Sequence, residues 1–337
     1  MHVRLLLAGF AAPPDAQVRL PALEKLLARG RRTSGPWTSA GQWLLEGFGV
    51  ERQADWPSAP FALRGDGGNP GEAFWVHADP VHLAAGNTQV AAAGGDALAI
   101  TREEADAFAG TINAHFGSAM QVFPLRPGRW YARLAAPPPG AAAPLADVLE
   151  CGIDVSGIDI SGAGDPDTGE SAIGWHALMN ELQMLLFEHP LNLAREERGA
   201  PAVNGVWLWG GGRDAPANAA PVTAVHADLP LAAGLASAAG VRAGPLPGRA
   251  AALLGHTHSG VVLAIHERAD VEALERDWMA PLAQALSSGD IGMLTLHLAT
   301  GEDILSVENT RSDLRRFWRR PRPLAHWLPR AESDSAR

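Results

Sequence analysis

The second half of the chain alternates between helix patterns and strand patterns, and this alternation restricts the folds that it can adopt. Strands that alternate with helices along a chain usually form a parallel sheet covered by helices on both faces. The sequence predicts helix Ser171–Glu188, strands Val203–Trp209 and Val222–Ala227, helices Pro230–Ala239 and Ala250–Leu254, strand Gly260–His266, helix Val271–Leu286 and strand Met293–Leu298. We therefore expect an α/β domain built on a mostly parallel sheet.

The N-terminal part supplies a further strand and helix. An apolar run from Leu5 to Ala12 is followed by Pro13-Pro14 and by an amphipathic helix pattern from Leu20 to Leu27. This order favours a first core strand over a signal peptide, because a turn and a helix follow the run directly. From Thr33 to Gly71 the sequence predicts an irregular connection with one short helix, Ala40–Gly47.

A small α+β lobe is expected between these two parts. Its predicted elements are strands Ala73–Ala78 and Thr88–Ala92, helix Arg102–Phe116 with a capping box at Thr101 and Glu104, and strands Gln121–Phe123 and Trp130–Leu134. A Pro/Ala/Gly-rich linker at Ala136–Pro144 closes the lobe. The predicted division is residues 1–70 and 140–330 for the α/β core, 71–139 for the inserted lobe and 331–337 for a flexible tail.

Composition narrows the function classes. The chain has 337 residues and a formal net charge of −10, which argues against a general nucleic-acid binder. No stretch approaches the roughly 20 apolar residues of a membrane span. Cys151 is the single cysteine, so an intrachain disulfide and a cysteine metal cluster are excluded. We expect a cytoplasmic protein that binds neither nucleic acid nor membrane.

The segment from His189 to Arg213 carries the predicted binding site. Asn192 is expected to cap a short helix that contains Arg195, and Asn204 precedes the strand that ends in Gly210-Gly211-Gly212 and Arg213. Glycines allow the backbone to approach a bound group, and arginine is a natural contact for an anion. Asn192, Arg195, Asn204 and Arg213 are therefore the predicted residues for a small anionic ligand. A helix cap and a packing arginine would account for the first two without a ligand.

Six arginines near the C-terminus form a second positively charged segment. Arg311, Arg315, Arg316, Arg319, Arg320 and Arg322 fall within twelve residues. They are interpreted either as a solvated helix face or as a contact surface for an anion or phosphate.

The segment from Asn192 to Arg213 resembles the cofactor-independent phosphoglycerate mutases of archaeal type, members of the alkaline phosphatase superfamily. The shared pattern is Asn-x-x-Arg, a glycine, a further Asn and Trp-Leu-Trp-Gly-x-Gly-Arg. Over its whole length the chain resembles a bacterial family of predicted phosphoglycerate mutases, the regulatory proteins of RpfE type, through segments Ala78–Leu83, Ile100–Ala107, Pro127–Leu134 and Met179–Leu186. The resemblance implies an alkaline-phosphatase-like sheet.

The resemblance also implies a two-metal site, from which this chain departs. The mutases carry an Asp-rich motif after the first strand, where this chain has Leu7-Ala8-Gly9, and an Asp-His pair at a late strand, where it has Leu296-His297-Leu298. His266 and Asp270 match part of a third motif and are the weak candidates for metal ligands. Asp270 would otherwise be a helix N-cap. Substitute ligands could come from His77, Asp79, His82, His256 and His258.

Two functions follow from these observations. The first is a mutase-like protein without the two-metal site or any cofactor, which binds a small phosphorylated molecule or a protein partner in a regulatory role. The second is an active mutase that moves phosphate between 3- and 2-phosphoglycerate and uses Mn²⁺ or Mg²⁺ on substitute ligands.

Overall fold

The computed structural model describes residues 1–8, 19–85, 89–137, 143–146, 149, 153–154, 169–219, 221–255, 261–266, 270–300 and 303–327. These residues form two compact units. Unit 1 contains Met1–Gly49 and Ala217–Arg337, and unit 2 contains Val50–Pro216. Unit 2 is therefore an insertion between two halves of unit 1. No helix in the described ranges has the length and apolar character to cross a bilayer.

Unit 1 is built on a seven-stranded sheet in the order β10-β9-β11-β1-β12-β13-β2. The strands are β10 (Arg242–Gly244), β9 (Val222–His226), β11 (Val261–His266), β1 (His2–Leu7), β12 (Met293–Thr300), β13 (Asp303–Thr310) and β2 (Arg31–Pro36). The first five are parallel to one another, whereas β13 pairs antiparallel with β12 and β2 pairs antiparallel with β13 at one edge. The predicted mostly parallel sheet is confirmed.

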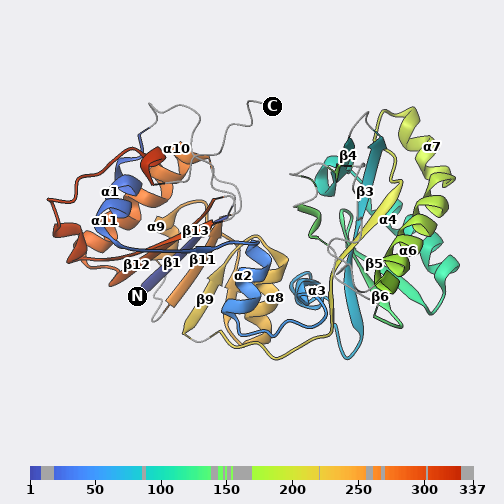
Figure 1. Ribbon diagram of the computed structural model, residues 1–337, viewed down its shortest axis with the longest axis horizontal. Helices are drawn as coiled ribbons and strands as arrows, with labels where there is room; N and C mark the ends of the chain where they lie inside the picture. Colours follow the sequence, from blue (N-terminus) through green and yellow to red (C-terminus); the bar gives the residue numbers. More distant parts are fainter. Residues whose placement is uncertain are drawn as a thin grey trace. The chain divides into compact units, whose positions relative to one another are not determined.

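Helices pack on both faces of this sheet. Val3, Leu5 and Leu7 of β1 point into a buried core with α1 (Pro21–Arg29), α9 (Ala250–Leu254) and the continuous helical stretch formed by α10 (Val271–Leu274), η2 (Glu275–Met279) and α11 (Ala280–Ser288). On the opposite face the ring of Trp43, from α2 (Ala40–Gly47), lies under the guanidinium of Arg4. Figure 1 shows α2 beside α8 (Pro230–Ala238), which packs on β9 and β10.

Unit 2 contains an antiparallel sheet with helices on both faces. Its order is β5 (Met120–Arg126), β6 (Arg129–Leu134), β3 (Phe74–Ala85), β4 (Gln89–Gly94) and β7 (Ile153–Asp154), and β8 (Gly205–Gly212) also pairs with β3. One face of the sheet forms a core with α4 (Arg102–Phe116) and α6 (Gly169–Phe187). α7 (Pro190–Glu197) follows α6, and α3 (Ser58–Gly65) contacts β3 and β8. The predicted capping box of Thr101 and Glu104 is present at the start of α4.

The structure corrects three of the predictions. The strand predicted at Val203–Trp209 does not join the parallel sheet, because β8 pairs antiparallel with β3 from Val81 to Trp75. The inserted unit consequently extends from Val50 to Pro216 instead of 71–139. The predicted irregular connection at Thr33–Gly71 contains the end of β2 and the whole of α3. β2 lacked an apolar signal because nearly all of its residues are exposed. The predicted tail at 331–337 lies outside the described residues.

Candidate functional site

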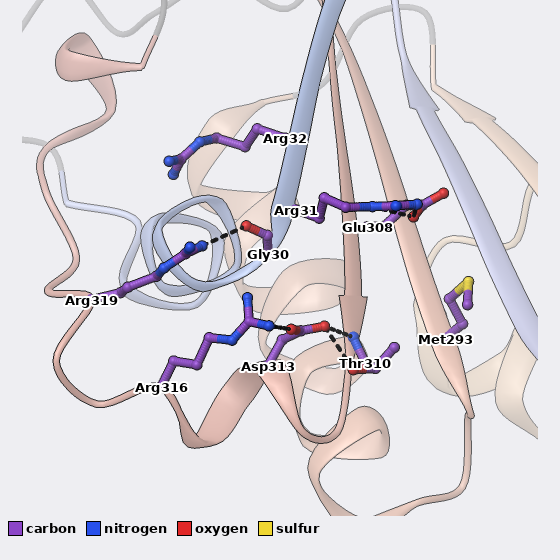
Figure 2. Close-up of a pocket in the computed structure, with 9 residues that line it drawn as sticks. All are labelled: Gly30, Arg31, Arg32, Met293, Glu308, Thr310, Asp313, Arg316 and Arg319. Carbon is purple, nitrogen blue, oxygen red and sulfur yellow. Dashed lines mark hydrogen bonds and ion pairs between the residues drawn. The ribbon is translucent and has the colours of Figure 1, made fainter.

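A hollow of about 660 Å³ in unit 1 is lined mainly by charged side chains. We call it the arginine hollow; its lining residues are Gly30, Arg31, Arg32, Met293, Glu308, Thr310, Asp313, Arg316 and Arg319 (Figure 2). They come from the end of α1, the start of β2, the start of β12, the end of β13 and the turn η3 (Asp313–Arg315) with the residues that follow it. The hollow thus lies where β12 begins, at the edge opposite to the carboxyl ends of the parallel strands.

Two of the four arginines in the hollow are neutralised by carboxylates. Arg31 of β2 lies opposite Glu308 of β13 in the strand register and forms an ion pair with it. Arg316 forms a 2.9 Å ion pair with Asp313, whose carboxylate also accepts hydrogen bonds from the backbone and hydroxyl of Thr310. Figure 2 shows Asp313 held between Arg316 and Thr310. Its pKa lies below the usual value, because hydrogen bonds from Thr310 and the charge of Arg316 outweigh the opposing effect of burial.

Arg32 and Arg319 form no ion pair with a carboxylate among the ion pairs of the described residues. Each donates to a carbonyl near the end of α1: Arg32 to Leu27 at 2.8 Å and Arg319 to Gly30 at 3.2 Å. Arg32 also stacks over Trp327, with 4.5 Å from its central carbon to the ring centroid. Burial and the positive charge of Arg319 lower the pKa of Arg32. Both guanidiniums therefore line the hollow without a direct ion pair among the described residues, although the Asp313 carboxylate attracts Arg319 from a longer distance.

This arrangement is suited to an oxyanion. A guanidinium carries five N–H donors, so one bond to a helix carbonyl leaves donors for a ligand. Its planar fork fits carboxylate and phosphate oxygens. The excess of positive charge here contrasts with the net charge of −10 for the whole chain. The C-terminal run of arginines indicated this site, whereas Arg31 and Arg32 were missed because they lie on an exposed strand far away in the sequence.

The predicted site residues Asn192 and Arg195 lie in unit 2 and are buried. His189, not Asn192, caps α7; Asn192 lies inside the helix, where its amide bonds the carbonyl of Leu186 and both backbone groups of Val203. Arg195 pairs with Glu104 at 2.7 Å and donates to the carbonyls of Leu98 and Pro201. These contacts connect α7 to α4 and to the start of β8.

Asn204 and Arg213 flank β8 at its two ends. The amide of Asn204 bonds both the backbone N–H and the carbonyl of Leu83 at 2.8 Å, which extends the β3–β8 pairing. The Arg213 backbone exchanges two hydrogen bonds with the Gln53 side chain, and its exposed guanidinium donates to the carbonyl of Glu72. The structure brings none of the four into a common cluster, and their role in binding an anion stays a prediction.

The glycines before Arg213 serve close packing. Gly210 has φ of +64°, and a Cβ there would lie 2.1 Å from the Ser58 hydroxyl. A Cβ on Gly212 would lie 2.3 Å from Pro57. The glycine run therefore allows the start of α3 to pack directly on β8.

His77 and Asp79 lie on the same face of β3 and are buried. His77 stacks on Trp209 at 3.9 Å between ring centroids, and burial lowers its pKa to about 3. Asp79 accepts a 2.7 Å hydrogen bond from the indole of Trp209, and burial raises its pKa to about 7. His82 bonds the carbonyl of Ala202 instead. His82 therefore has different contacts from those of His77 and Asp79, the other two candidate ligands.

Of the remaining candidate metal ligands, the structure describes His266 and Asp270 but not His256 and His258. His266 ends β11 and lies opposite Leu7 of β1, while His256 and His258 lie outside the described residues. Asp270 accepts a 2.7 Å bond from the N–H of Ala273 and is the N-cap of α10, which confirms that interpretation. In the described part of the chain no cluster of three or more His, Cys, Asp or Glu side chains is arranged to hold a metal ion.

Comparison with solved structures identifies similar folds at low sequence identity. The PH0037 protein from Pyrococcus horikoshii is 14% identical and aligns with a TM-score of 0.53 over 92% of this chain and 87% of its own. This chain shares its fold. A cofactor-independent phosphoglycerate mutase from Thermoplasma acidophilum is 17% identical, with a TM-score of 0.46 over 92% of this chain and 89% of its own. No protein-family model matches the chain. A search of curated proteins gives no match either.

Proposed function

We propose that the chain is a phosphoglycerate-mutase-like protein on an alkaline-phosphatase-like scaffold that has lost the two-metal site. In this proposal it binds a small phosphorylated molecule and acts as a regulatory protein, in the manner of the bacterial RpfE-type family that its sequence resembles. A cytoplasmic location fits the single cysteine, since reduced thiols and few disulfides are usual there.

The ends of two neighbouring strands support the loss of the metal site. β1 and β12 are adjacent and parallel, and Leu7 lies opposite Leu298 in their register. Both leucines are fully buried. Divalent cations that assist phosphoryl transfer need oxygen or imidazole ligands. Leu7 and Leu298, which lie in the segments that correspond to two of the mutases' metal motifs, cannot supply such ligands.

The arginine hollow is the observation that carries the binding function. Arg32 and Arg319 both line the hollow, and neither forms an ion pair with a carboxylate of the described residues. The charge of Arg319 acts on Arg32, so an oxyanion bound near both would reduce their mutual repulsion. Phosphate, with several acceptor oxygens, can bond both guanidiniums at once.

The test is calorimetric titration of the purified chain with 3-phosphoglycerate and with inorganic phosphate. The variant Arg32→Gln/Arg319→Gln should bind at least tenfold more weakly. Arg276→Gln is the matched control, because Arg276 is exposed and already paired with Asp277. Equal affinity in all three proteins would refute the site. An Arg213→Ala variant tests the earlier prediction for that residue in the same titration.

The alternative is an active mutase that uses Mn²⁺ or Mg²⁺. Its supporting observation is that His77 and Asp79 lie on one face of β3. Metal analysis of the purified protein and an assay for conversion of 3- to 2-phosphoglycerate, with and without Mn²⁺, decide between the two functions. Stoichiometric metal with turnover would establish the alternative, while neither is expected under the proposal.

A further inference from the structure

Arg4 stands on a polar strip across one face of the unit 1 sheet. Side chains at paired positions of parallel strands point to the same face, so Arg4 of β1 shares its face with Thr295 of β12. His2 and His297 belong to the same face, since they are two residues away on their strands. His2 bonds the hydroxyl of Thr295 at 2.8 Å, and the ring of Trp43 covers the strip at Arg4. The side chains on this part of the sheet face are therefore polar, although they belong to the central sheet of unit 1.

The neighbours of Arg4 are electrically neutral. The closest nitrogen of Arg4 lies 3.4 Å from Nε2 of His297, and because guanidinium can only donate, Nε2 must accept. The proton of His297 then resides on Nδ1, which donates to the hydroxyl of Ser306 at 2.8 Å. Burial and the charge of Arg4 lower the pKa of His297 to about 3, so the ring stays neutral near pH 7. Burial also lowers the pKa of His2, and the charge of Arg4 adds to that effect.

The half-buried guanidinium of Arg4 forms no ion pair with a carboxylate in the described part of the chain. Glu308 is the acid that acts on it from a distance, and the Glu308 carboxylate is held by Arg31. A charge withdrawn from water without a counter-ion is costly and is normally paired in native proteins. Among the described residues, Arg4 therefore has no anionic partner in direct contact.

We propose that Arg4 anchors a second oxyanion site on this sheet face, in the same row of paired residues as Glu308 and Arg31 of the arginine hollow but not required for the hollow. The ligand presents a carboxylate or phosphate to the guanidinium of Arg4, and the hydroxyl of Thr295 and the imidazole of His2 are the polar groups beside it. Trp43 limits the approach from one side through its contact with the guanidinium. Both ligand classes offer the paired oxygen atoms that a guanidinium binds with two parallel bonds.

Thermal unfolding of the full chain tests this site, with sodium phosphate and sodium acetate as probes at equal ionic strength and chloride as the reference salt. One or both probes should raise the unfolding temperature of the Arg4→Gln variant less than that of the parent. Which probe loses its effect identifies the ligand as phosphate-like or carboxylate-like. Arg4→Lys keeps the charge and should retain part of the response, and the exposed Arg276→Gln variant should respond like the parent.

Stability without added anion separates a binding role from a structural one. If Arg4 is an unpaired charge awaiting a ligand, Arg4→Gln should unfold at the same or a higher temperature than the parent in chloride. A lower unfolding temperature in chloride, with an unchanged increase in phosphate and acetate, would show that Arg4 serves the fold and would overturn the proposal. In the Arg32→Gln/Arg319→Gln background, the increase in unfolding temperature that depends on Arg4 should persist. The experiment therefore distinguishes a wrong assignment of the arginine hollow from a wrong assignment of the Arg4 site.

Discussion

At the scale of single residues, Asp79 carries the clearest pH dependence. Burial raises its pKa to about 7 against a usual value of 3.8, while the indole of Trp209 and the charge of Arg129 only partly oppose this. The folded state therefore binds a proton that the unfolded chain has already released between pH 4 and pH 7. Stability that depends on Asp79 is present below pH 4 and is lost as the pH rises through 7.

The variant Asp79→Asn should remove this loss, because an amide keeps an acceptor for the indole of Trp209 and carries no charge. Relative to the parent, it should gain roughly 1–3 kcal/mol at pH 8 and little at pH 4.5. Urea unfolding at both pH values measures the difference. The pKa of neighbouring His77 is also lowered by burial, so the parent and the variant both lose stability as the pH falls below 6.5. This loss is the same in the two proteins and does not change the difference between them. A gain of the same size at both pH values would contradict the assignment.

Arg195 is the other residue with a large expected effect. Its fully buried side chain joins α7 to Glu104 of α4, and Arg198 binds the other oxygen of the same carboxylate. The substitution Arg195→Met leaves Glu104 with a partner that is half exposed. We expect a loss of roughly 3–5 kcal/mol in urea unfolding. Arg198→Gln is the control and should cost about 1 kcal/mol or less. Equal effects from both would show that burial does not determine the strength of the pair.

At the scale of elements, the packing of α3 on β8 depends on Gly210. The variant Gly210→Ala would force a left-handed backbone on alanine and place a Cβ against the Ser58 hydroxyl and, at 3.0 Å, the His77 ring. Circular dichroism during thermal unfolding should show a loss of roughly 1–3 kcal/mol. Gly110→Ala is the control: it lies within α4 with no atom near its Cβ position and should stabilise by about 0.5–1 kcal/mol. Adding Ser58→Ala should restore part of the loss, and no restoration would argue against this contact.

The elements that the sequence predicted are those whose signals are local. Helix Arg102–Phe116 was predicted to the residue, because the capping box at Thr101 marks its start and Gly117 its end. The π-helical turn at Glu275–Met279 was not foreseen, yet the helical stretch around it was. β2 and α3 were missed: β2 is an exposed edge strand, and α3 is buried on nearly every residue and has no one-sided apolar pattern.

The candidate sites depend on long-range pairing and could be predicted only in part. The sequence indicated a run of six C-terminal arginines, interpreted as a solvated helix face or an anion surface, and Arg316 and Arg319 belong to it. The partner strand that supplies Arg31 and Arg32 is determined by its register with β13. The sequence did not indicate Arg4 as a binding residue, because its lack of a carboxylate partner among the described residues results from neutral neighbours on β12 and α2. The Asn-x-x-Arg pattern was noticed as binding chemistry, whereas the structure places both side chains in buried contacts within unit 2.

At the scale of the whole molecule, the chain enters and leaves unit 2 at neighbouring points. The backbone N–H of Asn218 donates to the carbonyl of Phe48 at 2.7 Å, which holds the two borders of unit 1 together. On the unit 2 side, the paired hydrogen bonds between Gln53 and Arg213 do the same. An insertion whose ends are adjacent can be removed without stretching the remaining domain.

The fragment Val50–Pro216 should therefore fold by itself, with a cooperative urea transition and dispersed amide signals in an NMR spectrum. Its core is complete within the fragment, since α4, α6 and the strands of its sheet supply the buried residues. The matched control is the fragment 71–139, the lobe expected from sequence. It lacks Leu182, Leu186 and Leu208, which are fully buried and belong to the same core cluster as Phe108 and Trp130 in the complete unit. Without them the apolar face of its sheet is open to water, and this shorter fragment should show no cooperative transition. A cooperative transition in the shorter fragment would show that β8 and α6 are additions to a stable lobe, and the absence of one in Val50–Pro216 would show that the insertion needs unit 1 to fold.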